Sequence, residues 1–157
     1  GTLVESTHLS VDGSLDCTMS DEPKTLEHHW IVDLHGCPAG LLDDHDLIRN
    51  QLKETTDRYE LSLLKIVSNQ FEPQGVTAVG LLAESHLSIH TWPEHCYAAV
   101  DIFTCGSDQH LHAACQFIAN SLKAKQSTVL RLQRGVLNAD GPGKITASQV
   151  TLDELSS

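Results

Sequence analysis

Apolar and polar residues alternate strictly along SHLSIHTW (85–92), a pattern typical of a β-strand with one buried face. In such a strand Leu87 and Ile89 point to one side, and His86 and His90 point to the other. Further strands are predicted over residues 30–36, 59–67, 75–83, 97–105 and 127–136. The chain is therefore expected to form a sheet.

Two segments repeat their apolar residues at helical spacing. The first begins near Leu41 and carries three aspartates in its first turn, where the helix dipole favours anions. The second runs from Ser107, a natural N-cap, to about Lys125. Two helices and about six strands predict an α/β (α+β) two-layer sandwich, a mainly antiparallel sheet with helices on one face. The other face needs a cover, so we expect a homodimer that associates through the sheet side.

The length of 157 residues fits one ordinary domain. Residues 1–26 are polar and weakly periodic, and we interpret them as a flexible N-terminal extension. Residues 27–157 are expected to form a single domain. Its tail beyond residue 136 contains Gly and Pro and is expected to be loose.

The net charge and the cysteines limit which partners the protein is expected to bind and in which compartment it is expected to lie. A formal net charge of −11 disfavours binding to nucleic acid or to an anionic membrane surface, because both repel negative charge. No apolar stretch is long enough to cross a membrane. The five cysteines are odd in number and include no CxxC pair, so a disulfide scaffold is not expected. We therefore expect a cytoplasmic protein.

Ligand-type side chains gather between residues 86 and 105, which raises the alternative of a metal site. They are His86, His90, His95, Cys96 and Cys105. His86 and His90 are four residues apart, which aligns side chains on a helix but separates them by about 13 Å along a strand. No second clustered pair supplies the remaining ligands, so we expect no metal.

Four motifs in the chain resemble one enzyme family. AESHLSIHTWPE (83–94) is followed by YAAVDIFTCG (97–106) and preceded by FEPQGVT (71–77) and WIVDLHGCP (30–38). Together they resemble the prokaryotic S-adenosylmethionine decarboxylases over roughly 28–135. The resemblance implies pyruvoyl-dependent decarboxylation of S-adenosylmethionine to the aminopropyl donor of spermidine biosynthesis. It also implies a two-layer α/β fold and active sites near the interface of a homodimer of αβ units.

The resemblance further implies that the peptide bond between Glu84 and Ser85 breaks by itself. The Ser85 hydroxyl would attack the Glu84 carbonyl to form an ester, and elimination with loss of ammonia would leave a pyruvoyl group at Ser85. His90 matches the residue that removes the Ser85 α-proton during elimination. Thr77 stands where these enzymes usually carry a serine that supports the ester step, and its extra methyl restricts its rotamers. The products would be a β chain ending at Glu84 and an α chain beginning at Ser85.

Decarboxylation of an amino acid needs an electron sink, and a Schiff base to the pyruvoyl ketone provides one. Cys105 matches the acid that returns a proton to the α-carbon. A thiol suits this transfer because its unperturbed pKa is about 8.5. The plainer interpretation makes Cys105 a small buried residue at a strand end.

Four further residues are candidates for substrate binding. Phe71 matches an aromatic residue that lies against the adenine, and Trp92 is expected to extend the same wall. Glu94 is expected to accept hydrogen bonds from the ribose hydroxyls, and His86 to orient the pyruvoyl carbonyl or to line the pocket. The alternatives are core packing for the two aromatic residues and an exposed turn for Glu94.

Two other functions remain open on the sequence alone. A pyruvoyl enzyme of the same kind could act on arginine or ornithine, although a small cationic amino acid needs no adenine platform. A non-catalytic homologue would be expected to lack Ser85, His90 or Cys105, and all three are present.

Overall fold

The structure is a computed structural model that describes residues 24–83 and 85–155. Its elements in chain order are β1 (Lys24–His35), α1 (Ala39–Leu42), α2 (His45–Arg58), β2 (Leu63–Gln70), β3 (Val76–Leu82), β4 (His86–Trp92), the 3-10 helix η1 (Pro93–His95), β5 (Tyr97–Thr104), α3 (Asp108–Ser121), β6 (Gln126–Asn138), β7 (Gly141–Pro142) and β8 (Thr146–Val150).

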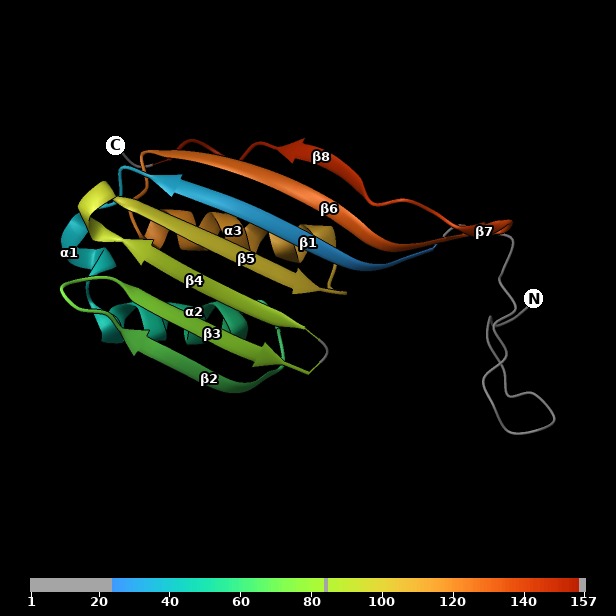
Figure 1. The fold of residues 1–157 in the computed structure, drawn as a ribbon. Coiled ribbons are helices and arrows are strands. Elements are labelled where there is room, and N and C mark those ends of the chain that lie inside the picture. Colours follow the sequence, from blue (N-terminus) through green and yellow to red (C-terminus); the bar gives the residue numbers. More distant parts are fainter. Residues whose placement is uncertain (1–23, 84, 156–157) are drawn as a thin grey trace.

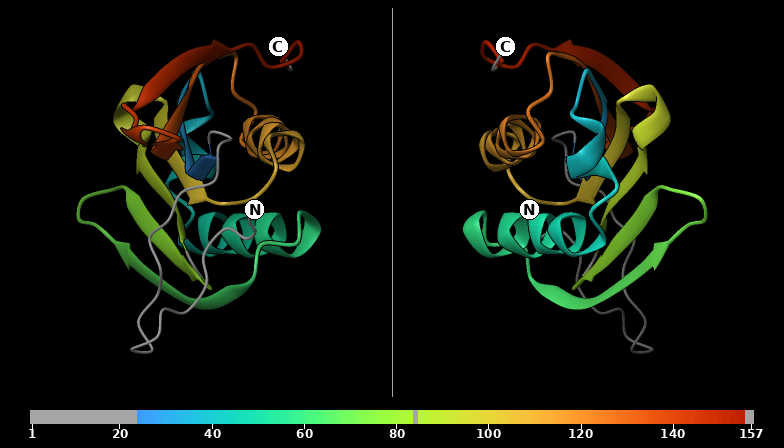
Figure 2. Two further views of the ribbon diagram at one scale, coloured as in Figure 1. Left: turned by 90° about the vertical axis from the view of Figure 1, so that its right-hand side faces the viewer. Right: turned by 90° about the vertical axis from the view of Figure 1, so that its left-hand side faces the viewer.

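All the described strands form one sheet of eight strands. The order is β2-β3-β4-β5-β1-β6-β7, with β8 also paired to β6, and every pairing is antiparallel. The sheet is strongly twisted, and α2 and α3 pack side by side on the same face of it (Figures 1 and 2). The predicted two-layer fold with helices on one face is therefore confirmed.

The alternating pattern of the sequence explains which face of the sheet is buried. Leu87 and Ile89 of β4 are fully buried under the helices, as are Val32 and Leu34 of β1. The helices contribute their apolar stripes to the same core, namely Ile48 and Leu52 from α2 and Leu111, Ala114, Cys115 and Ile118 from α3. The helical face of the sheet thus carries the hydrophobic core.

One glycine allows α2 to approach the sheet closely. A Cβ atom on Gly80 of β3 would lie 2.6 Å from Cδ2 of Leu52, which is closer than real Cβ contacts. The predicted N-cap of α3 is confirmed. The helix predicted from near Leu41 instead divides into α1 and α2, so that Asp44 is the N-cap of α2 and only Asp46 lies in its first turn. Asp44 accepts a hydrogen bond from the Leu47 backbone N–H, and Ser107 accepts one from that of His110.

Several predicted boundaries need correction. β1 begins at Lys24, so residues 24–26 of the predicted extension belong to the sheet, where Lys24 and Thr25 pair with β6. The other residues of that extension lie outside the described part. The strand predicted at 59–67 begins at Leu63, because Tyr59 caps the end of α2. The tail expected to be loose adds β7 and β8, which are held by backbone pairing to β6 rather than by an apolar face.

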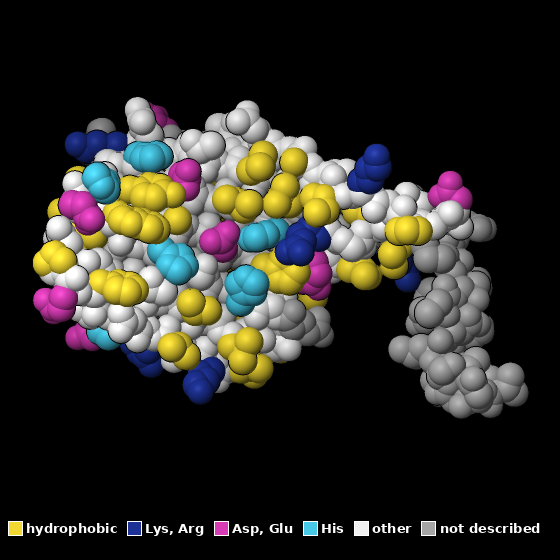
Figure 3. Space-filling view, viewed as in Figure 1, with side chains coloured by type: hydrophobic (Ala, Val, Ile, Leu, Met, Phe, Trp, Pro, Cys, Tyr) yellow, Lys and Arg dark blue, Asp and Glu magenta, His cyan; other side chains and the backbone are white. Residues whose placement is uncertain are grey.

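None of the helices in the described residues covers the second face of the sheet, which shows apolar side chains mixed with histidines (Figure 3). We call it the open face. Alternation places Val67, Val79 and Leu81 on this face, opposite the buried Ala78 and Leu82. Val67 is 58% and Leu81 52% exposed.

Candidate active site

Ser85 lies between β3 and β4, at one end of the sheet. It is only 8% exposed. Its hydroxyl donates a hydrogen bond to Oε1 of Glu27 over 3.2 Å, and its carbonyl accepts one from the Leu82 backbone N–H over 2.9 Å. The nucleophile predicted from the motif is thus held against a carboxylate. Glu84, the other residue of the predicted cleavage site, lies outside the described residues.

Glu27 was not among the sequence candidates, because it lies near the start of the predicted domain in a polar segment. It stands on β1, and 58 residues separate it from Ser85 in the chain. The signal that could have found it is the alternation of β1, which continues from His29 back to Glu27.

Cys105 lies at the same end of the sheet, directly after β5. It is exposed, so the interpretation as a small buried residue is wrong. The residue lines a cavity of about 240 Å³. The other lining residues are Glu60, Leu61, Ser62, Leu82, Ala83, Thr104 and Gly106. The cavity therefore joins the candidate proton donor to the β3 end that leads to the predicted cleavage site.

A cluster of rings lies next to Ser85 on the open face. The His86 ring stacks on Phe103 with centroids 5.3 Å apart, and His29 meets Phe103 edge-on at 5.6 Å. Nε2 of His29 lies 3.1 Å from a carboxylate oxygen of Asp101. The Arg134 guanidinium lies 4.9 Å from the Phe103 centroid, on the ring face. The predicted residue His86 is thus part of a polar and aromatic surface beside the nucleophile.

Thr77 and His90 lie together, away from Ser85. They are directly opposite each other on β3 and β4, and Thr77 Oγ1 is hydrogen bonded to His90 Nδ1 at 2.9 Å. His90 is five positions after Ser85 along extended chain, which corresponds to about 16 Å. A single chain therefore does not bring His90 to the Ser85 α-carbon.

The three remaining candidates lie near the Thr77–His90 end. Phe71 follows β2, Trp92 ends β4, and Glu94 lies in η1. Phe71 is 47% and Trp92 40% exposed, so the core-packing alternative is wrong for both. Phe71 is held by a backbone hydrogen bond of 2.8 Å from its N–H to the Gly75 carbonyl.

Trp92 belongs to a row of stacked rings. Its centroid lies 5.2 Å from that of Tyr97, which in turn stacks on His35 at 5.1 Å. The Tyr97 hydroxyl donates to a carboxylate oxygen of Asp33 over 2.6 Å. Desolvation raises the pKa of Tyr97 to about 12, and the hydrogen bond to Asp33 adds to the shift, so the phenol stays protonated at neutral pH. A cavity of about 440 Å³ opens here, lined by Asp33, His35, Trp92, His95 and Tyr97.

The comparisons with known proteins agree with the motifs. The model of the S-adenosylmethionine decarboxylase family matches residues 28–135, most of the chain. The chain belongs to the S-adenosylmethionine decarboxylase family.

Relatives in this decarboxylase family come from both bacteria and archaea. The S-adenosylmethionine decarboxylase proenzyme of Prochlorococcus marinus (strain MIT 9313) is 44% identical over 106 residues, which covers 68% of this chain and 85% of the relative. The proenzyme of Methanococcus maripaludis (strain C5) is 40% identical over 117 residues and covers 74% and 96%. The crystal structure of the adenosylmethionine decarboxylase from Aquifex aeolicus matches with a TM-score of 0.69 and 37% identity, over 73% of this chain and 95% of that one.

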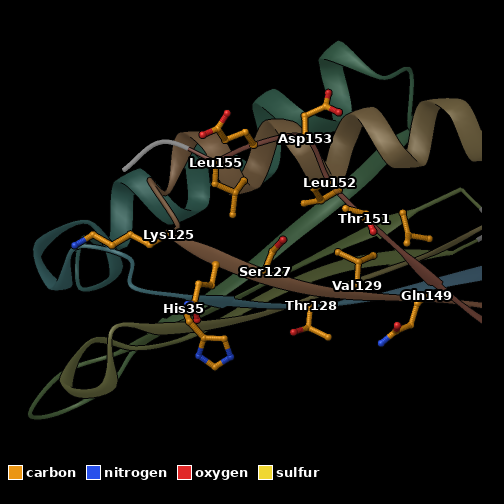
Figure 4. Close-up of a pocket in the computed structure, with 13 residues that line it drawn as sticks. His35, Lys125, Ser127, Thr128, Val129, Gln149, Thr151, Leu152, Asp153 and Leu155 are labelled. Carbon is orange, nitrogen blue, oxygen red and sulfur yellow. The ribbon is translucent and has the colours of Figure 1, made fainter.

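Other features of this member of the decarboxylase family lie outside the candidate site. A cavity of about 530 Å³ runs between β6, β8 and the C-terminal segment, and its lining includes none of the predicted site residues (Figure 4). Burial raises the pKa of Cys115 to about 12. Burial, with a contribution from Cys96, raises that of Cys37 to about 11. These two thiols are therefore protonated at neutral pH and unreactive.

Two classes of feature are missing from the described residues of this decarboxylase. Within residues 24–83 and 85–155, no three His, Cys, Asp or Glu side chains are grouped so that they could hold a metal ion. In the same ranges, no helix is long and apolar enough to span a membrane.

Proposed function

We propose that this chain cleaves itself between Glu84 and Ser85 and then decarboxylates S-adenosylmethionine with the pyruvoyl group formed from Ser85. The observation that carries the proposal is the buried Ser85 hydroxyl, which donates a hydrogen bond to the Glu27 carboxylate and lies in the part of the chain that the family model matches. The residues around Ser85 suit such a group, because little solvent reaches it and the Cys105 thiol lines a cavity at the same end of the sheet. The pyruvoyl ketone, conjugated with an amide, supplies the sink for the electrons left when carbon dioxide departs.

The surrounding side chains have separate tasks in this proposal. Cys105 donates the proton that replaces the lost carboxyl group at the α-carbon. Phe71 and Trp92 are partly exposed aromatic residues, and aromatic surface of this kind suits an adenine base and a sulfonium cation. Glu94 accepts hydrogen bonds from the ribose, and His86 lines the pocket beside the reacting centre. The product is the aminopropyl donor for spermidine biosynthesis.

A second copy of the chain completes the site in this proposal. Ser85, Cys105 and His86 lie at one end of the sheet, whereas Thr77 and His90 lie about 16 Å away along β4. The open face between them exposes Val67 and Leu81, and apolar surface of this kind favours association. If two open faces pack in a symmetric antiparallel arrangement, each Ser85 end faces the partner's Thr77–His90 end.

Mixed dimers of two inactive variants test this arrangement. Ser85→Ala and His90→Ala are each expected to stop maturation alone. When the two chains are mixed and reassembled, half of the dimers are mixed, and one of the two sites in each mixed dimer has both residues intact. About a quarter of all sites should then mature and turn over substrate. Intact mass spectrometry should show that every cleaved α chain carries the His90→Ala substitution.

A matched control uses two residues from the same end of the sheet. Because Ser85 and Cys105 of one site come from the same chain, a mixture of Ser85→Ala and Cys105→Ala contains no dimer in which one site has both residues intact. Decarboxylation should therefore not return. An absence of cleaved chains in the Ser85→Ala and His90→Ala mixture would show that His90 does not act across the interface.

The function itself is tested by mass and by turnover. Intact mass spectrometry under denaturing, reducing conditions should show two chains that split after Glu84, the later one lacking one ammonia relative to a serine start. Release of labelled carbon dioxide should then be measured with S-adenosylmethionine, ornithine and arginine. Turnover of only the amino acids would replace the proposed substrate, and an uncleaved, inactive chain would indicate a non-catalytic homologue.

We also propose a cytoplasmic location. Support comes from the buried thiols Cys37 and Cys115, which form no disulfide in the structure and suit a reducing compartment.

A further inference from the structure

The hydrogen bond between Ser85 and Glu27 joins two elements that are far apart in the sequence. β1 pairs with β5 only as far as His28, which lies opposite Thr104, the last residue of β5. Glu27 is the next residue on β1 and pairs with Arg134 of β6 on its other side. β5 has ended at this level, and the Glu27 side chain contacts Ser85, the residue that precedes β4. The carboxylate therefore reaches Ser85, and Oγ to Oε1 measures 3.2 Å.

This position gives the carboxylate direct access to a reacting atom. A serine hydroxyl is a weak nucleophile unless a neighbouring base accepts its proton. An ionised carboxylate accepts hydrogen bonds and has no proton to donate, so it orients the hydroxyl and can take its proton. Two nearby rings contact other groups: the His29 ring lies 3.1 Å from a carboxylate oxygen of Asp101, and the His86 ring stacks on Phe103.

We infer that Glu27 is the proton acceptor for the Ser85 hydroxyl in the first step of self-cleavage, an inference that rests on the proposed function. The Ser85 Oγ forms a bond to the carbonyl carbon of residue 84 as its proton moves to the Glu27 carboxylate. The bond from that carbon to the Ser85 nitrogen then breaks, and Glu27 returns the proton to the nitrogen. An ester and a free amine result, the carboxylate is regenerated, and no further reactant is needed.

The experiment follows cleavage in newly made protein. Wild type, Glu27→Gln and Glu27→Asp are synthesised in a short cell-free pulse, and the fraction cleaved after residue 84 is measured over time by intact mass. General base catalysis typically contributes 10²–10⁴-fold, so Glu27→Gln should slow cleavage by about 100-fold or more. Glu27→Asp, which keeps a carboxylate on a shorter side chain, should cleave at an intermediate rate. Glu54→Gln, the same change at an exposed position of α2, should cleave as wild type does.

Two readouts separate a base from a structural residue. In Glu27→Ala, added formate or acetate should accelerate cleavage in a concentration-dependent way, because a small carboxylate can occupy the vacated space. Hydroxylamine, which cuts esters, should release no fragments from Glu27→Gln, since that variant stops before the ester. Thermal unfolding of each variant reports whether the fold is retained.

The possible outcomes separate this inference from the proposed function. If the wild-type protein cleaves and the Glu27→Gln variant cleaves equally fast, the inferred role of Glu27 is wrong and the proposed function stands. The role of Glu27 is also wrong if the Glu27→Ala variant cleaves slowly and neither formate nor acetate accelerates it. That result would mean that Glu27 only supports the local structure, which a small acid cannot restore. Wild-type protein that never cleaves overturns the proposed function and the inference together.

Discussion

Replacing Ser85 with alanine is expected to leave a single uncleaved chain of about 17 kDa that releases no carbon dioxide from S-adenosylmethionine. Alanine has no hydroxyl, so no ester can form with residue 84 and the electron sink is never made. The methyl side chain fits the space of the buried serine, and the loss of one hydrogen bond to a charged group costs about 1.5–3 kcal/mol. The fold should therefore survive, and activity should fall to background.

The measurement pairs intact mass with a decarboxylation assay on the same preparation. Ser148→Ala on β8 is the matched control, because it makes the same chemical change at an exposed strand position. It should cleave and turn over normally. Cleavage after residue 84 in the Ser85→Ala protein would mean that another nucleophile or a contaminating protease makes the cut, and the proposed self-processing would be wrong.

Replacing Cys105 with alanine is expected to separate maturation from turnover. The thiol lines a cavity that reaches Leu82 and Ala83 but forms no part of the proposed ester, so the two chains should still appear by mass. Turnover should fall by about 100-fold or more, because a positioned general acid typically contributes 10²–10⁴-fold. The residual reaction should also return protons to the wrong atom and consume the pyruvoyl group by transamination.

Cys115→Ala provides the comparison for that experiment. It removes the same sulfur from a fully buried position on α3, so it should lower stability but leave the activity of the folded enzyme intact. Turnover is measured by labelled carbon dioxide and loss of the pyruvoyl group by the mass of the α chain. A Cys105→Ala enzyme that matures and turns over at the wild-type rate would remove Cys105 from the mechanism.

The two-layer architecture could be predicted because its signals are local. Burial of one strand face produces the alternation seen around Leu87 and Ile89, and burial of one helix stripe produces the spacing of Leu111, Cys115 and Ile118. β8 gave no such signal, since it is held to β6 by backbone hydrogen bonds and its side chains are largely exposed. The start of β1 was missed for the same reason, because Lys24 and Thr25 pair with β6 and none of residues 24–26 is buried.

The candidate site was also predictable only in part from the sequence. The sequence alone was enough to propose Ser85, His90 and Cys105 as the residues that carry the chemistry, because they stand in short motifs whose spacing is a property of the chain. Which of these residues meet depends on the tertiary structure. The pairing of β1 between β5 and β6 brings Glu27 to Ser85, and the straight extension of β4 keeps His90 about 16 Å away. Strand order and register depend on how distant segments pack together, and no local periodicity records them.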